Sequence, residues 1–216
     1  MISERLKAIA SMINTKNVID VGCDHGLLDI YLVKTNNINC IASDINKKAL
    51  SRAIENIEKY GYSNKIKPIV SDGLDNITVK KDTTIVISGM GTTTIKHILS
   101  NEKSLKAEKI IIQSNNELYE LRLFMMNKGF IIEEEKALKE KNIYYVIISF
   151  VKGNAKYNKE KLYIGPNIIQ NHKIYQDYLI YLKGKEVLKL RKIPKKYFIL
   201  RLKTYIKLKK ICHYII

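Results

Sequence analysis

The chain has 216 residues, of which 46% are hydrophobic, so it can bury the core of one α/β domain with an appendage and is too apolar for a disordered protein. Its formal net charge of +17 favours a polyanion as partner. The three cysteines form no Cys-x-x-Cys pair, and we find neither a cleavable leader nor a membrane-length apolar run, so we expect no disulfide framework, no metal, no membrane contact and a reducing cytoplasm.

Segments rich in Ile and Val alternate with segments of helical periodicity. The expected strands span 18–22, 38–44, 66–71, 84–88 and 109–113, and the expected helices span 4–13, 26–34, 46–60, 92–100 and 116–128. This alternation predicts a mainly parallel sheet. After Gly129 two strands follow that are joined by a turn near Lys141 and Asn142, which predicts an antiparallel pair. Five parallel strands and a terminal antiparallel hairpin form the α/β, Rossmann-like sheet typical of class I methyltransferases.

The turn after the first strand reads "GCDHG" and is the first candidate binding site. From Asp20 to Gly26 the spacing is Asp-x-Gly-x-Asp-x-Gly, which differs from the Gly-x-Gly-x-x-Gly of dinucleotide sites. Two carboxylates would repel a pyrophosphate but suit an ammonium group. Gly22 and Gly26 would let a ligand approach the backbone, whose free amides suit a carboxylate. A plain strand-to-helix connection would show the same glycines, so both interpretations stay open.

The ends of the next strands add acidic and small residues. Asp44 ends the second strand eighteen residues after Gly26, about where an acidic residue receives a ribose diol. S-adenosylmethionine carries both an ammonium group and a ribose. Asp72 follows the third strand, where it could receive the adenine amino group, and "SGMG" follows the fourth. The residues expected to bind this cofactor are Asp20, Gly22, Cys23, His25, Asp44, Ile45, Asp72, Gly73 and Ser88.

Composition changes after Lys152, so we expect a methyltransferase domain over 1–152 and a basic tail over 153–216. The first segment holds 22 basic and 18 acidic residues, whereas the tail holds 16 and 3, a net charge of +13. Codon bias toward lysine would act on both segments alike and does not explain the shortage of acids. The tail therefore predicts nucleic-acid binding, with a merely solvated basic face as the alternative.

Within the tail, a polar connection with Gly165 and Pro166 precedes two expected antiparallel helices. The first runs from Ile168 to about Leu190 and the second starts at Tyr197, with a turn at Pro194. Their expected apolar seam consists of Ile168, Tyr175, Leu179, Leu182, Leu200, Leu208, Ile211 and Ile215, with Thr204 on the same stripe. The residues expected to bind phosphates are Lys189, Arg191, Lys192, Lys195 and Lys196.

In the order of its motifs, the sequence resembles the bacterial tRNA methyltransferases that modify N1 of adenine 22. The residues that carry the resemblance are Gly22, Asp24, His25, Asp72, Gly73, Leu74, Gly89, Met90, Gly91, Gln113, Asn115, Leu121, Arg122, Gly165 and Pro166. They span essentially the whole chain, including a basic two-helix tail of the kind that family carries. The resemblance implies an S-adenosylmethionine-dependent enzyme with tRNA as partner.

The resemblance also implies roles for individual residues. The target adenine would be held by Gly89, Met90, Gly91, Gln113 and Asn115. N1 of adenine has a free lone pair, so no strong base is required, and Asp24 is the candidate for stabilising the cationic product. His25 would contact the methionine carboxylate or only satisfy local backbone. A ribosomal-RNA or small-molecule methyltransferase and a non-catalytic RNA-binding relative remain alternatives, and we favour a monomer.

Four positions depart from the family pattern. Leu27 and Asp29 stand where the first turn of the family usually has tyrosine and proline. Thr92 stands in place of a second glycine, and Ser114 replaces the proline of Gln-Pro-Asn. A Gly-Pro pair after the second strand is also missing, and this chain has "NKKAL" there.

Overall fold

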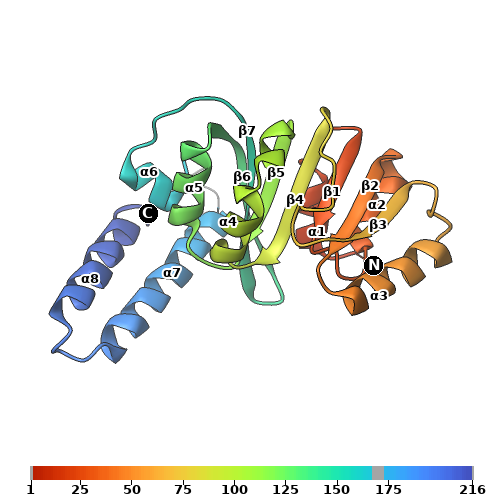
Figure 1. Ribbon diagram of the computed structural model, residues 1–216. Coiled ribbons are helices and arrows are strands. Elements are labelled where there is room, and N and C mark those ends of the chain that lie inside the picture. The colour runs from red at the N-terminus through yellow and green to blue at the C-terminus, as the bar shows by residue number, and fades with distance from the viewer. Residues whose placement is uncertain (1, 167–172, 216) are drawn as a thin grey trace.

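The protein is built on a seven-stranded sheet, shown in Figure 1 as a computed structural model that describes residues 2–166 and 173–215. The strand order is β3-β2-β1-β4-β5-β7-β6. Strands β1 to β5 are parallel, and β7 is antiparallel to both of its neighbours. Their bounds are β1 (Asn17–Val21), β2 (Asn39–Asp44), β3 (Ile66–Val70), β4 (Thr83–Met90), β5 (Lys109–Ser114), β6 (Phe130–Glu140) and β7 (Ile143–Lys152). The predicted sheet, including its terminal hairpin, is confirmed.

Helices cover both faces of the sheet (Figure 1). One face carries α1 (Glu4–Ala10), α2 (Leu27–Asn36) and α3 (Lys47–Lys59), and the other carries α4 (Thr92–Ser100) and α5 (Leu118–Asn127). A short 3-10 helix, η1 (Glu102–Lys106), follows α4. Both faces can be covered because the central strands are buried throughout, as in the first five residues of β4. Parallel sheets require such continuous burial, which the Ile- and Val-rich runs provide.

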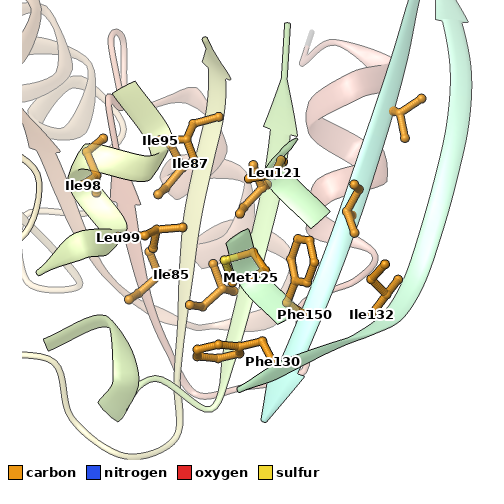
Figure 2. Packing of buried hydrophobic residues seen from close by; sticks show 14 of the residues in the cluster. Ile85, Ile87, Ile95, Ile98, Leu99, Leu121, Met125, Phe130, Ile132 and Phe150 are labelled. Carbon is orange, nitrogen blue, oxygen red and sulfur yellow. The ribbon is translucent and has the colours of Figure 1, made fainter. Parts of the chain in front are cut away.

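The larger hydrophobic core lies between the sheet and helices α4 and α5. Figure 2 shows Ile85 and Ile87 of β4 beside Ile95 and Leu99 of α4, and all four side chains are fully buried. Burial of one such side chain stabilises the fold by about 1.5–3 kcal/mol. This core fixes β4 and β5 against their helices, and these two strands carry the candidate residues for the target base.

The tail consists of α6 (Lys159–Ile164), α7 (Lys173–Lys192) and α8 (Phe198–His213), and the α7–α8 hairpin projects away from the sheet (Figure 1). Its base is part of the larger core, where Tyr175, Tyr178, Leu179 and Ile211 are buried. The predicted two-helix tail is confirmed. The polar connection predicted before it was wrong in part, because α6 forms there. A helix of six residues is too short to show a periodic pattern in the sequence.

The predicted apolar seam of the tail needs one correction. Tyr175, Leu179, Thr204 and Ile211 are buried as expected, but Leu200 is 46% exposed. Leu200 lies in the first turn of α8, where its side chain lines a groove and is not buried between α7 and α8. The predicted start of the first tail helix at Ile168 lies outside the described residues.

A buried arginine connects the tail to the sheet. Arg122 of α5 is 1% exposed, and its Nε donates to Oε1 of Glu135 on β6 at 2.7 Å. Its Nη1 donates to the carbonyl of Leu162 in α6 at 2.9 Å. The hydroxyl of Tyr175 in α7 donates to the carbonyl of Ile164 at 3.0 Å. Three hydrogen bonds therefore join α5, β6, α6 and α7 at one point.

We predict that Arg122→Met lowers the free energy of unfolding by about 3–5 kcal/mol, because the Glu135 carboxylate would stay buried without the guanidinium. Chemical denaturation followed by circular dichroism measures this. In the double variant Arg122→Met/Glu135→Leu the buried charge is gone, so much of the lost stability should return. Equal stability of wild type and Arg122→Met would contradict the prediction.

Candidate active site

The candidate residues from five strands lie along one edge of the sheet. In a parallel sheet all carboxyl ends meet at the same edge, and the register here aligns them closely. Val21 pairs with both Ser43 and Ile87, Asp44 pairs with Val70, and Ser88 pairs with Gln113. The residues that follow β1, β2, β3, β4 and β5 therefore border one site.

The backbone of the first turn is occupied by the protein itself. The amides of Gly22 and Cys23 both donate to the carbonyl of Ser43, at 2.8 and 3.0 Å, and the amide of Gly26 donates to the carbonyl of Cys23. The expectation that these glycine amides are free for a ligand was therefore wrong. The turn uses them to fix itself to β2.

The two glycines of this turn also have reasons within the protein. Both have a positive φ, +82° at Gly22 and +66° at Gly26, a backbone conformation that residues with a side chain rarely adopt. A Cβ at Gly22 would lie 2.2 Å from Cε of Met90, and one at Gly26 would lie 3.3 Å from Cβ of Ala53. The turn thus packs against the end of β4 on one side and against α3 on the other.

Three charged or titratable side chains stand at the open side of the turn. Asp24 is exposed, with Oδ2 at 3.6 Å from Nε2 of His25 and Oδ1 at 3.7 Å from Nη1 of Arg52. The carbonyl of His25 accepts from the side chain of Asn56 at 3.0 Å. Asp24 is placed where it can meet a solvent-side ligand, while its charge is already balanced in part by Arg52. Its predicted role in catalysis stays a prediction.

The ends of β2 and β3 form the next part of the edge. Asp44 is partly exposed, and its Oδ1 accepts from the amide of Asn46 at 2.8 Å, which orients the carboxylate. Ile45 beside it is 65% exposed, an apolar surface suited to a base. Asp72 is exposed, and its Oδ1 lies 3.8 Å from Nε2 of His97. Gly73 packs against Ile98 of α4.

Gln113 is the centre of the hydrogen bonds between β4 and β5. It is 1% exposed, and its Oε1 accepts from the amide of Gly89 at 3.1 Å and from Nη1 of Arg5 at 2.8 Å. Its Nε2 donates to Oδ1 of Asn115 at 3.2 Å, and Nδ2 of Asn115 donates to the carbonyl of Gly89 at 2.8 Å. The amide of Asn115 donates to the carbonyl of Met90. The predicted substrate residues Gly89, Met90, Gln113 and Asn115 are therefore joined in one network, whereas the carbonyl of Gly91 accepts from the amide of Ile95 at the start of α4.

Two of the departures from the family pattern contact each other. Oγ1 of Thr92 and Oγ of Ser114 lie 2.9 Å apart, and both hydroxyls donate to the carbonyl of Asn116. Oδ1 of Asn116 accepts from the amide of Thr92 at 2.9 Å. Thr92 and Ser114 thus form one local arrangement that holds α4 against the end of β5.

A third departure, Asp29, lies behind the first turn. Asp29 is fully buried, Asp20 is 5% exposed, and neither oxygen of Asp29 accepts a hydrogen bond from a described residue. Burial raises the pKa of Asp20 to about 7, and burial together with the Asp20 charge raises the pKa of Asp29 well above its ordinary value. Two adjacent buried carboxyls do not both ionise, so the pair retains a proton near neutral pH.

A groove of about 1080 Å³ leads from the end of β5 to the tail. It is lined at one end by Gln113 and Asn115 and further along by Tyr144, Tyr145, Tyr181, Lys185, Lys189, Lys192 and Tyr197. The rings of Tyr144 and Tyr181 have centroids 5.2 Å apart. Of the predicted phosphate-binding residues, the groove lining includes Lys189 and Lys192, whereas Arg191, Lys195 and Lys196 are exposed outside it.

Residues 2–166 and 173–215 contain neither a cluster of metal ligands nor a helix that could cross a membrane. Within these ranges, no three His, Cys, Asp or Glu side chains are grouped so that they could hold a metal ion. The helices described there include none with both the length and the apolarity needed to cross a bilayer.

Several known proteins resemble this chain in sequence and in fold. The family model "Methyltransferase domain" matches residues 2–148. A Mycoplasma genitalium protein named as a tRNA methyltransferase is 34% identical over 174 residues, which cover 77% of this chain and 78% of that protein. The structure of TrmK from M. capricolum with S-adenosyl-homocysteine has 30% identity and a TM-score of 0.85, and the match covers 100% of this chain and 98% of that one.

A Streptococcus pneumoniae protein described as a tRNA (m1A22) methyltransferase has 28% identity and a TM-score of 0.88, with 100% of both chains covered. The chain belongs to the bacterial tRNA (m1A22) methyltransferase family. Membership in this family includes the tail, because the matches to the solved structures extend over all of the chain.

The sequence did not predict several residues that contact the candidate site, above all Arg5, Arg52 and Asn116. The composition of the chain could have pointed to the arginines. Of the 38 basic residues 33 are lysine, so an arginine is rare in this chain and is a candidate for a specific role. Arg5 and Arg52 both lie at the site, and Arg122 forms the buried ion pair.

We predict that Asp29→Asn makes the stability of the protein less dependent on pH. In the wild type the folded carboxyl pair holds more protons than the unfolded chain between about pH 4 and 7, so the free energy of unfolding falls as pH rises through that range. The asparagine amide would donate to Asp20 and carry no charge. Melting temperatures from pH 5 to 8 test this, at about 2–4 °C per kcal/mol for a chain of this size.

The exposed Asp75 provides the control, because Asp75→Asn removes a carboxyl that is not buried. It should leave the pH dependence of the wild type unchanged. If the melting temperature of Asp29→Asn follows the wild-type curve from pH 5 to 8, the carboxyl pair does not retain a proton in this range.

Proposed function

We propose that the protein transfers the methyl group of S-adenosylmethionine to N1 of adenine 22 in tRNA. The observation that carries this proposal is the match over 100% of the chain, tail included, to the S. pneumoniae tRNA (m1A22) methyltransferase. A relative that shared only the sheet would support methyl transfer but would not indicate the substrate. The network around Gln113 and the basic, tyrosine-lined groove beside it supply the chemistry that such a substrate needs.

The residues at the ends of β1, β2 and β3 fit S-adenosylmethionine. The S. pneumoniae relative has also been solved in complex with this cofactor, at 27% identity. Here the oriented Asp44 carboxylate would accept from the ribose hydroxyls, Ile45 would cover one face of the adenine, and Asp72 would accept from its amino group. When bound, the cofactor supplies an electrophilic methyl group on a sulfonium. Asp20, Asp24 and His25 would border the charged amino-acid end of the cofactor.

At the ends of β4 and β5, the protein would orient the target base. N1 of adenine attacks through an in-plane lone pair and loses no proton, so alignment and exclusion of water are the main requirements. The residues at 88–91 read Ser-Gly-Met-Gly and not Asn-Pro-Pro-Tyr, the motif that exocyclic-amine methyltransferases typically have. Asn115 is exposed and offers amide groups to the base edge. Asp24 would offset the positive charge of the methylated product.

The tail and the groove would hold the RNA. N1 lies on the Watson–Crick edge, so adenine 22 must be unpaired or extruded before it reacts. Tyrosine rings in the groove can stack on exposed bases, and lysines at its border can contact phosphates. Arg191 is exposed and, within the described part of the chain, donates to no other residue. It is therefore free for a phosphate oxygen.

The direct test is methyl transfer to tRNA followed by mapping of the modified base. We expect label from S-adenosylmethionine at N1 of adenine 22 in total tRNA and in a single transcript. A transcript with guanine at position 22 should stay unlabelled. Label at another base, on ribosomal RNA only, or on no RNA despite cofactor binding would contradict the proposal, and each result would support one of the alternatives.

We predict that replacing Lys189, Arg191, Lys192, Lys195 and Lys196 with glutamine weakens tRNA binding and flattens its salt dependence. Each lost phosphate contact should reduce the slope of log affinity against log salt by about 0.7–0.9. The affinity for S-adenosylmethionine should not change. Filter binding over a salt series measures the first quantity and calorimetry the second.

A control variant carries five glutamines at exposed lysines outside the tail, Lys59, Lys67, Lys80, Lys81 and Lys106. Its net charge falls by the same amount, so a difference between the two variants reports position and not overall charge. If both variants bind tRNA with the same salt slope, the tail is only a solvated basic face.

A further inference from the structure

We propose that Arg5 positions the target adenine by fixing the orientation of the Gln113 and Asn115 amides. This inference rests on the proposed function, because it assigns Arg5 to the base-binding end of the same site. Arg5 is 108 residues away from Gln113 in the sequence and reaches it from the first turn of α1. Nothing in the spacing of the motifs at β4 and β5 points to this helix.

Three contacts hold the Arg5 guanidinium in place. Its Nη1 donates to Oε1 of Gln113 at 2.8 Å, and its Cζ lies 5.3 Å from the centre of the Tyr145 ring. The same Nη1 would lie 3.2 Å from a Cβ at Gly89, so the guanidinium packs directly against the backbone at the end of β4. Arg5 therefore touches β4, β5 and β7 at once.

These contacts determine which way each amide faces. A guanidinium can only donate, and so can the backbone amide of Gly89, so the atom of Gln113 that meets both must be the carbonyl oxygen. The Gln113 amino group is then directed to Oδ1 of Asn115, and the Asn115 amino group to the carbonyl of Gly89. Hydrogen bonds from a charged donor are roughly twice as strong as neutral ones, which makes Arg5 the strongest constraint on this chain of amides.

The orientation matters for the chemistry at N1. Adenine presents its N6 amino group next to N1, so the surrounding protein should offer an acceptor to N6 and no donor to N1. In the observed arrangement the Oδ1 side of Asn115 keeps a second lone pair for such an amino group. With both amides reversed, an amino group would take its place and could donate to N1, which would occupy the lone pair that attacks the methyl.

Arg5 is not needed to hold α1 on the sheet. Ile9 is fully buried and Met12 nearly so, and both belong to the core under α1 and α2. The helix is capped by Ser3, whose Oγ accepts from the amide of Leu6. Loss of the guanidinium should therefore leave the fold in place and change the site only.

The test compares Arg5→Met, Arg5→Lys and Lys7→Met in the full-length protein. Lys7 lies on the same helix and pairs with Glu4, so its replacement controls for loss of a positive charge. We expect Arg5→Met to lower kcat for N1 methylation by about 10–100-fold, the effect of a misplaced reacting group. KM for tRNA, the affinity for S-adenosylmethionine and the melting temperature should stay close to wild type. Arg5→Lys keeps a charged donor and should restore part of kcat, and Lys7→Met should match wild type.

A second comparison asks whether Arg5 acts through Gln113. In the Gln113→Leu background, Arg5→Met should cost little further activity, since the two changes remove one interaction. Full additivity would overturn the proposal. So would wild-type kcat in Arg5→Met, or a loss of cofactor affinity as large as the loss of kcat, which would place the effect at the cofactor and not at the target base. If wild type itself leaves N1 of adenine 22 unmodified, the proposed function fails; if wild type is active and Arg5→Met equals it, only this inference fails.

Discussion

The alignment of parallel strands at one edge is the constraint on which the rest of the site depends. Strands β1, β2 and β3 end within one residue of one another in register, and β4 and β5 end together three residues beyond the end of β1, so short turns from distant parts of the sequence meet there. The turns have little freedom of their own. The first is fixed to β2 through the carbonyl of Ser43, and those after β4 and β5 are fixed to each other through Gln113. The hydrophobic cores on both faces set the strand positions, and the backbone hydrogen bonds of the turns transmit that order to the site.

Most of the fold could be predicted from the sequence because its signals are local. Apolar runs such as β4 and helical stripes such as α3 need only their own residues, and the glycine at 129 marks the change to an antiparallel hairpin. The site could be predicted only as far as the ends of strands. Arg5 reaches Gln113 across 108 residues and the amides of the first turn bond to Ser43, and neither contact has a local pattern. The burial of Asp29 was equally hidden, since a polar residue in the first turn of a helix usually faces solvent.

Lysine and arginine have separate tasks in this chain. The lysines make up most of the positive charge and stand largely on the surface, where a mobile point charge is sufficient for a polyanion. Arginine occurs where a planar group must donate in several directions, as Arg122 does to Glu135 and α6, and Arg201 does to the carbonyls of Leu190 and Ile193. Arg5 follows the same rule at the site. Arg191 is the exposed arginine of the tail, and its fork is suited to a phosphate.

The departures from the family pattern make physical sense as pairs. Thr92 and Ser114 come from different parts of the chain, yet their hydroxyls lie 2.9 Å apart and both bond to the carbonyl of Asn116. Either hydroxyl alone would keep the carbonyl of Asn116 as its partner and would lose only its contact with the other hydroxyl. Asp29 likewise lies beside Asp20, and burial raises the pKa of both carboxyls, which favours a protonated form for one of the two near neutral pH. A substitution at one member of such a pair changes the energy of the other, so the site has to be compared with its relatives by contacts and not position by position.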